Sequence, residues 1–373
     1  WKPVIVHAED IAIMTSKERV HRALRKESVD RVPIFMWFHP ETVRQLSEYF
    51  GINKSELGRA FPDDVKQTWV NNNYAMEGIV HEHDGETHTD AWGITWEKRH
   101  FFNQVVHFPL KDSAPEEVLA YSFPYDRLES LLEPMREVAE AAEGYFLGCD
   151  VSPCAFEMYW RLRGMEQALL DFVEHPELAR EMMRRCVDFA YRLGEEAIER
   201  FELDWLWSGD DVASQSSMMM SPDMWREFIK PELARLFELG TSSGLYVAHH
   251  CCGALRPIIP DLIEIGLDVL NPVQAGCPGM DAGELKREYG ADLAFMGGVD
   301  TQHLLPRGSS REVYEEVSRL IDVMTADGGG YILAASHTVP PEAPLENIFA
   351  LYEAAGVSRD EIRSRISAAA RTN

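Results

Sequence analysis

The chain has 373 residues, of which 45% are hydrophobic, so it can bury a sizeable core as one large domain or two medium ones. Its formal net charge of −26 argues against a nucleic-acid surface, which needs clustered lysine and arginine, and against binding to anionic membranes. We attribute the acidity to solubility.

The cysteines and the N-terminus indicate a reduced compartment. Six cysteines in a chain of this length do not resemble a disulfide scaffold. No apolar run approaches the roughly 18 residues that suggest a transmembrane helix. The first residues lack the basic and apolar regions of a signal peptide. We therefore expect a cytoplasmic protein in which residues 1–13 are a peripheral extension.

Helical patterns and short apolar runs alternate along the chain. Ser16 caps a first helix that continues to Arg25. Residues 89–110 alternate like a hairpin, and we expect them to form a β-flap inserted in an early loop that could cover the site. The predicted strands are 32–38, 65–70, 145–151, 204–208, 245–250, 267–272, 293–299 and 331–335. The later predicted helices are 40–50, 55–61, 128–142, two within 165–201, 221–239, 255–265, 284–289, 311–324, 345–355 and 360–370.

Eight strands that alternate with helices are the pattern of a (β/α)8 TIM barrel. A doubly wound open sheet would also fit, but it usually carries a glycine-rich phosphate loop after its first strand. Here the sequence Phe38-His39-Pro40 occupies that place. We find no internal repeat or linker. The sequence therefore predicts a single α/β domain over 1–373, a TIM barrel with an inserted β-hairpin flap and an N-terminal helical extension.

The stretch 244–253 is a short apolar run that ends in two histidines, two cysteines and a glycine. His250 and Cys252 are two residues apart, so both side chains can face one site. The apolar run at 331–335 is likewise followed by His337. Histidine and cysteine are ligands that suit zinc. We predict that His250, Cys252 and His337 hold one Zn²⁺ at the mouth of the barrel.

The histidines and cysteines also have a simpler interpretation. Buried cysteines are common, and a single histidine at a strand end is usually only hydrogen-bonded. His249 and Cys251 are the alternative ligand pair, but they would alternate onto the opposite face, toward the helices. Two histidines and one thiolate leave a fourth position open, which favours a Lewis acid over a structural zinc. Such an ion could stabilise a substrate oxygen or sulfur as an anion.

Other polar and aromatic residues follow the predicted strands, and the active site of a TIM barrel lies at those strand ends. Asp210 and Asp211 are catalytic candidates that point apart as neighbours. One could enter the pocket as an acid, a base or a binding group, and Asp210 could equally cap the next turn. Core packing would explain most of the aromatic residues. The candidate substrate-binding residues are His39, Trp37, Tyr159, Gln274 and Asp300.

Several further motifs give the chain a family resemblance, which extends from about Met14 to the C-terminus and is strongest after Asp204. They are Gly209-Asp210-Asp211-Val212, Ser221-Pro222 followed by Phe228-Ile229-Lys230-Pro231, His250-Cys251-Cys252-Gly253, Asn271-Pro272-Val273-Gln274, Gly297-Gly298-Val299-Asp300-Thr301-Gln302, and His337 ahead of 340–347. Together they resemble the uroporphyrinogen decarboxylase-like superfamily. That superfamily includes decarboxylases and a branch of zinc-dependent methyltransferases that work with corrinoid proteins.

The resemblance favours the methyltransferase branch. The decarboxylases grip substrate carboxylates with an N-terminal Arg-Gln-Ala-Gly-Arg motif, and the matching residues 37–41 contain no arginine. The methyltransferases use a His-x-Cys pair, matched by His250 and Cys252, and a later cysteine, where this chain has His337. This departure alters the charge and softness of the site. A glutamate ligand that some members carry near Gln274 is missing, so the fourth ligand is open.

The resemblance implies transfer of a methyl group between a small methylated substrate and the cobalt of a cobalamin. The chain has no Asp-x-His-x-x-Gly corrinoid-binding motif. We therefore expect the cobalamin on a separate corrinoid protein that docks over the barrel mouth. An aromatic pocket with zinc favours methoxylated aromatics and an O-demethylase activity. The alternatives are a decarboxylase or other lyase of the same superfamily acting on a small carboxylate, and a non-catalytic relative.

Overall fold

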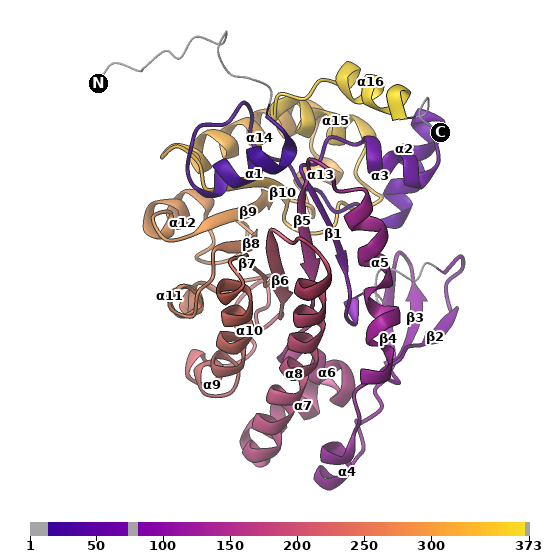
Figure 1. Ribbon diagram of the computed structural model, residues 1–373, viewed down its shortest axis with the longest axis vertical. Helices are drawn as coiled ribbons and strands as arrows, with labels where there is room; N and C mark the ends of the chain where they lie inside the picture. The colour runs from indigo at the N-terminus through magenta and orange to yellow at the C-terminus, as the bar shows by residue number, and fades with distance from the viewer. Residues whose placement is uncertain (1–13, 74–80, 370–373) are drawn as a thin grey trace.

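The centre of the molecule is a parallel β-sheet that curls, with helices on its outer side (Figure 1). The computed structural model describes residues 14–73 and 81–369. The strands of this sheet are β1 (Val65–Trp69), β5 (Phe146–Asp150), β6 (Trp205–Gly209), β7 (Tyr246–His250), β8 (Val269–Val273), β9 (Ala294–Val299) and β10 (Tyr331–Ala335). They pair in chain order, and every pairing is parallel. The α/β class and seven of the predicted strands are therefore confirmed.

The prediction of a regular first strand at 32–38 is wrong. Pro33 has no N–H to donate to a ladder, and the segment makes only isolated parallel bridges, such as Ile34 to Leu333. On its other side, the N–H of Asp64 donates to the carbonyl oxygen of Ile34 at 2.7 Å. The segment thus lies between β10 and the start of β1 without forming a strand of its own.

Two apolar clusters occupy the two faces of the sheet. The inner cluster includes Phe35, Trp205, Trp207 and Met296, whereas the larger outer cluster lies under the helices. Side chains alternate along a strand, so residues two apart share a face. Every residue of β5, β6, β8 and β10 is buried, as expected for parallel strands covered on both sides.

Helix α1 (Ser16–Leu24) closes the N-terminal end of the sheet. The N–H of Lys17 donates to the carbonyl of Gly144, just before β5, and Gly330, just before β10, donates to Ala23. The N-terminal helix predicted from Ser16 is present and packs on the sheet, but the prediction that Ser16 caps it is wrong. The cap is Thr15, whose hydroxyl accepts the N–H of Glu18 at 3.1 Å. Residues 1–13, predicted as a peripheral extension, lie outside the described residues.

The remaining helices cover the outside of the sheet and the loops. The predicted helix at 221–239 is two helices, and the second begins with Pro231 in its first turn. Three helices, α4, α6 and α13 below, were not predicted. The helices are α2 (Pro40–Phe50), α3 (Lys54–Ala60), α4 (Pro115–Ala120), α5 (Leu128–Glu140), α6 (Phe156–Arg163), α7 (Met165–Glu174), α8 (Pro176–Arg200), α9 (Pro222–Phe228), α10 (Lys230–Ser242), α11 (Ile259–Glu264), α12 (Ala282–Tyr289), α13 (Leu304–Arg307), α14 (Ser310–Met324), α15 (Leu345–Ala354) and α16 (Arg359–Ala369), with 3-10 turns at Tyr125–Arg127 and Arg256–Ile258.

A second, antiparallel sheet is inserted between β1 and β5. It consists of β2 (Thr87–Thr89), β3 (Thr95–Arg99) and β4 (Phe102–His107) and lies at the edge of the molecule (Figure 1). The hairpin predicted within 89–110 is present as β3 and β4, while β2 was not predicted. That this sheet covers the site stays a prediction.

Among the described residues, no helix combines the length and the apolar character that crossing a bilayer would require. All six cysteines are unpaired.

Candidate metal centre

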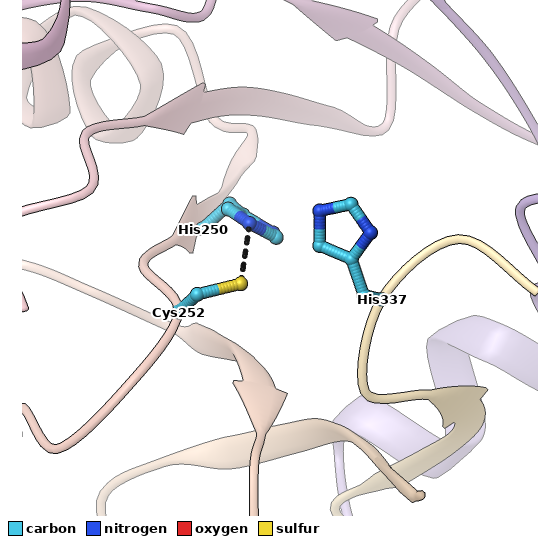
Figure 2. Close-up of side chains that lie close together, drawn as sticks. All are labelled: His250, Cys252 and His337. Atoms are coloured by element: carbon cyan, nitrogen blue, oxygen red, sulfur yellow. Dashed lines mark hydrogen bonds between the residues drawn. The ribbon is translucent and has the colours of Figure 1, made fainter. Parts of the chain in front are cut away.

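Three side chains from two distant parts of the chain meet at the C-terminal end of the sheet (Figure 2). His250 is the last residue of β7, Cys252 follows two residues later, and His337 comes just after β10. One ligand atom from each residue lies within 4.8 Å of the others. Nε2 of His250 is 3.3 Å from Sγ of Cys252, and Figure 2 shows the ring of His337 facing this pair.

The chemistry of these donors fits a zinc ion. Imidazole nitrogen and thiolate sulfur are the ligands that zinc prefers. Burial and the neighbouring Asp211 raise the pKa of the Cys252 thiol well above its ordinary value, so a thiolate there needs a cation beside it. Desolvation and the nearby His250 lower the pKa of His337, which favours the neutral imidazole that a metal requires. His337 is exposed, so the three residues are open to solvent on one side.

The alternative pair, His249 and Cys251, points away from this group. Both side chains are buried. Nδ1 of His249 lies 2.8 Å from the hydroxyl of Ser208, and its ring packs against Phe237 of α10. Burial lowers the pKa of His249 to about 3. This pair therefore faces the helices, on the opposite side of β7 from His250.

The two carboxylates after β6 point apart. Oδ1 of Asp211 accepts the backbone N–H of Cys252 at 2.7 Å and lies 3.9 Å from Nε2 of His250. Asp210 is fully buried, and its Oδ1 accepts the N–H of Glu157 in the first turn of α6 at 2.6 Å. Its Oδ2 has no hydrogen-bond partner among the described residues. Burial raises the pKa of Asp210 to about 7. Asp211 thus lies beside the candidate metal ligands, while Asp210 caps a helix.

Two of the predicted substrate-binding residues lie beside this centre. The ring of Trp37 is 5.9 Å from the ring of His250, measured between centroids. Oε1 of Gln274 accepts the N–H of Gly253, the residue after Cys252, at 2.9 Å. Trp37 therefore forms a wall of the site, and Gln274 holds the turn that carries a ligand.

The other three predicted substrate-binding residues form hydrogen bonds within the fold. His39 has Nδ1 accepting the N–H of Glu41 and Nε2 donating to the carbonyl of Phe101 at the tip of the β3–β4 hairpin. The buried hydroxyl of Tyr159 lies 2.5 Å from Oδ2 of Asp171 in α7. Oδ1 of Asp300 accepts two N–H groups of the next turn. Their role in substrate binding stays a prediction.

Sequence reasoning did not assign roles to three residues near the centre. Oδ1 of Asn271 lies 2.6 Å from Nδ1 of His250. The ring of Trp69 lies 6.4 Å from that of Trp37. Glu157 accepts the N–H of Asp211 at 3.3 Å. Asn271 pairs directly with His250 across β7 and β8, so the order of the predicted strands could have identified it.

The surroundings of the centre are tight on one side and open on the other. A Cβ added to Gly209, which pairs with His250 across β6 and β7, would lie 2.9 Å from Cβ of Ser152 and 3.4 Å from that of His250. On the other side, His337 is exposed. A separate hollow of about 630 Å³ lies between the loops after β6, β7 and β8, and its lining includes Met218, Ala254 and Pro278.

Known proteins similar to this chain include both decarboxylases and methyltransferases. A methylcobamide:CoM methyltransferase, MtaA, from Methanosarcina barkeri is 30% identical over 152 residues, 41% of this chain and 40% of that protein. This chain therefore aligns with less than half the length of that relative. A uroporphyrinogen decarboxylase from Coxiella burnetii (strain Dugway 5J108-111) is 22% identical over 355 residues, 90% of this chain and 94% of that protein.

Comparison of structures supports the same fold. A methyltransferase from Methanosarcina mazei superimposes with a TM-score of 0.62 and 19% identity, covering 92% of this chain and 98% of that one. The predicted resemblance to the superfamily is confirmed, and the similar methyltransferases support the predicted branch. Residues 105–356 match the family described as uroporphyrinogen decarboxylase (URO-D). Because this match covers more than half of the sequence, the chain belongs to the uroporphyrinogen decarboxylase family.

Proposed function

We propose that this chain is a zinc-dependent methyltransferase. It would move a methyl group between a small methylated substrate and the cobalamin of a separate corrinoid protein. The observation that carries the proposal is the convergence of His250, Cys252 and His337 within 4.8 Å. The likeness to a methylcobamide:CoM methyltransferase supports the same reaction class.

Each residue of the centre has a role in this proposal. When bound, zinc would supply a Lewis acid that stabilises negative charge on a substrate oxygen or sulfur. Nε2 of His250, Sγ of Cys252 and a ring nitrogen of His337 would hold it. Asp211 adds a negative charge beside these donors and is the stronger catalytic candidate. Asp210 stays a catalytic prediction, although its capping bonds favour a role in positioning α6.

The walls of the site support a substrate with an aromatic ring. Trp37 contacts His250, and Trp69 and Trp207 lie beside Trp37 at 6.4 and 5.3 Å between ring centroids. Aromatic walls pack well against a planar ring. We therefore propose a methoxylated aromatic as the methyl donor, which makes the activity an O-demethylation.

The open side of the centre supports docking of the corrinoid protein. The hollow near the Cys252 turn is lined mainly by methionine, proline and alanine side chains, together with two serines and Arg256. Methionine adapts its shape to irregular partners, and apolar hollows of this kind are common at interaction sites. The cobalamin would then reach the three ligands from outside the sheet.

Decarboxylation is the second candidate, because similarity to uroporphyrinogen decarboxylases covers 90% of the chain. Residues 37–41 contain no arginine, and the wall that they contribute is aromatic. A substrate with several carboxylates would need basic partners there. We therefore rank a decarboxylase or other lyase acting on a small carboxylate second, ahead of a non-catalytic relative.

Three predictions, about the closure of the barrel, the domain organisation and the cellular location, accompany the proposed function. We propose that the segment 32–38 and the seven strands together act as a closed (β/α)8 barrel. The hydrogen bonds of that segment on both of its sides support this view. We also propose that residues 1–373 are one domain. The unpaired cysteines are consistent with the expected cytoplasmic location.

Metal analysis and a methyl-transfer assay test the proposal. We expect one zinc per chain, and we expect methyl transfer from a panel of methoxylated aromatics to added cob(I)alamin. A His337→Ala variant should lose most of its zinc. A wild-type protein without stoichiometric zinc after metal-replete purification would contradict the proposal. Decarboxylation of small carboxylates by the same preparation would favour the second candidate.

A further inference from the structure

Polar side chains from the strands on either side of β7 form hydrogen bonds to the segment that carries His250 and Cys252. The pair lies on a turn, 250–253, that leaves the end of that strand. Asp211 reaches it from the loop after β6, Asn271 from the middle of β8, and Gln274 from the residue after β8. Each of the three offers an oxygen to an N–H group of the turn.

We propose that Asp211, Asn271 and Gln274 are positioning residues that fix His250 and Cys252 in the arrangement of a ligand pair before an ion binds. This inference rests on the proposed function of the centre as a metal site. It gives Asp211 and Gln274 a structural task within that site and adds Asn271, which had no role.

Asn271 determines which nitrogen of His250 is free. Its Oδ1 lies 2.6 Å from Nδ1 of His250 and can only accept, so the proton is held on Nδ1. The lone pair is then on Nε2, which lies 3.3 Å from Sγ of Cys252. A partner on the second ring nitrogen is what orients metal-binding histidines in general. Asn271 is 1% exposed, so water does not easily replace it.

Asp211 and Gln274 hold the backbone that carries Cys252. They accept the consecutive N–H groups of Cys252 and Gly253 at 2.7 and 2.9 Å. Gly253 has a φ of 93°, and a Cβ there would lie 2.3 Å from the carbonyl oxygen of Ser214. The turn therefore needs a left-handed glycine, and the two acceptors bind the N–H groups of the two peptides that flank the Cα of Cys252.

The test compares Asn271→Leu with Asn271→Asp, which keeps an oxygen acceptor. Asn347→Leu is the matched control, because Asn347 is also buried and its amide donates to two backbone carbonyls away from the centre. Zinc dissociation constants of the full chain would be measured by competition with a chromophoric chelator. We expect Asn271→Leu to weaken zinc binding about 10- to 100-fold. Asn271→Asp and Asn347→Leu should stay close to wild type.

A second readout does not depend on metal. In the metal-free wild type, ¹⁵N NMR of the histidine rings should show His250 protonated on Nδ1. Asn271→Leu should lose that preference, whereas Asn347→Leu should keep it. An unchanged tautomer and unchanged zinc affinity in Asn271→Leu would overturn the inference. A wild type with the expected tautomer but no zinc binding would refute the proposed function and leave the positioning by Asn271 supported.

Asp211 and Gln274 are tested in the same way. Asp211→Asn keeps an oxygen that can accept the N–H of Cys252, whereas Asp211→Ala does not. We expect Asp211→Ala and Gln274→Ala to weaken zinc binding more than Asp211→Asn does. Equal losses in the two Asp211 variants would show that its charge, and not its hydrogen bond, is what matters, and would overturn its positioning role.

Discussion

The two ends of the parallel sheet differ in how completely their polar groups are satisfied. At the N-terminal end, Asp64 is fully buried and accepts hydrogen bonds from Arg19, from Arg31 and from the N–H of Ile34. Arg19 in turn binds Asp30 through two nitrogens. Every charge in this group has an opposite charge as a partner. Such a network fixes the fold and leaves little capacity to bind anything else.

At the C-terminal end, several polar atoms have no partner within the described part of the chain. These are Oδ2 of Asp210, Nδ2 of Asn271 and Nε1 of Trp207, all buried. The three proposed ligands lie among them, partly open to solvent. Unsatisfied buried groups cost free energy, so those near the three proposed ligands mark a place where binding can offset that cost. The contrast separates a part of the sheet that stabilises the fold from the part in which we propose the reaction.

Cys252→Ala should give the largest effect. Removing a ligand should abolish stoichiometric zinc and lower methyl transfer by at least about 100-fold, since even indirect partners of a metal can cost that much. The metal-free protein should change its free energy of unfolding by less than about 1 kcal/mol. Metal analysis measures the zinc content, the methyl-transfer assay measures the activity, and urea titration measures the free energy of unfolding. Cys186→Ala, which alters a buried thiol in α8, is the control and should keep its zinc.

Asp64→Ala should destabilise the N-terminal end of the sheet. It removes the carboxylate that pairs with Arg19 and Arg31, so we expect a loss of about 3–5 kcal/mol in the free energy of unfolding. The folded fraction should bind zinc as the wild type does. Urea unfolding followed by circular dichroism measures the loss. A stable Asp64→Ala protein with weakened zinc binding would contradict the separation of the two ends.

Part of the pH dependence of stability should also come from the N-terminal end. Burial alone would raise the pKa of Asp204, but hydrogen bonds from His21, the N–H of Leu147 and Lys17 lower it below its ordinary value. The folded state thus favours the carboxylate. Its contribution is present above the unfolded pKa of about 4 and is lost as the pH falls through the lower folded value.

Asp204→Asn should therefore be less stable than the wild type at pH 7, and the difference should shrink as the pH falls below about 4. Urea titrations of both proteins at several pH values measure this. A difference that stays constant down to acidic pH would show that the charge of Asp204 contributes nothing.

His39→Ala should have the smallest effect. Its Nε2 donates to the carbonyl of Phe101 at 2.6 Å, so loss of this bond should cost about 1 kcal/mol. Hydrogen exchange at the β3–β4 tip should increase, and zinc binding should not change. Loss of zinc in this variant would place His39 in the reactive centre, against the contacts described above.

The alternating strands and helices could be predicted from the sequence. The features that depend on how neighbouring strands pair could not. The strands from 65–70 to 331–335 could be predicted because each is a short apolar run between helical patterns. The segment 32–38 has the same composition, but Pro33 interrupts its ladder, and only neighbouring strands reveal that. Likewise, His250, Cys252 and His337 could be predicted as strand-end ligands, whereas the bond from Asn271 depends on how β7 and β8 pair.

The substrate-binding predictions show the same limit. Position at a strand end marked His39 and Asp300, but their hydrogen bonds to Phe101 and to a turn follow from local geometry that composition does not encode. Trp69 also ends a predicted strand, yet nothing in its neighbourhood indicated that it would lie beside Trp37. Proximity on the inner face of the curled sheet is set by side chains from several strands at once.

Gly209 limits how the floor of the reactive centre can be remodelled. Even a methyl group at this position would have to push aside Ser152, and it would already touch the Cβ of His250. A larger side chain would therefore press on His250 as well. Changes that adapt the protein to a different small molecule must therefore arise in the loops that follow the strands. Redesign of this scaffold should keep residues 209 and 253 without a side chain and diversify 213–220 and 254–257 instead.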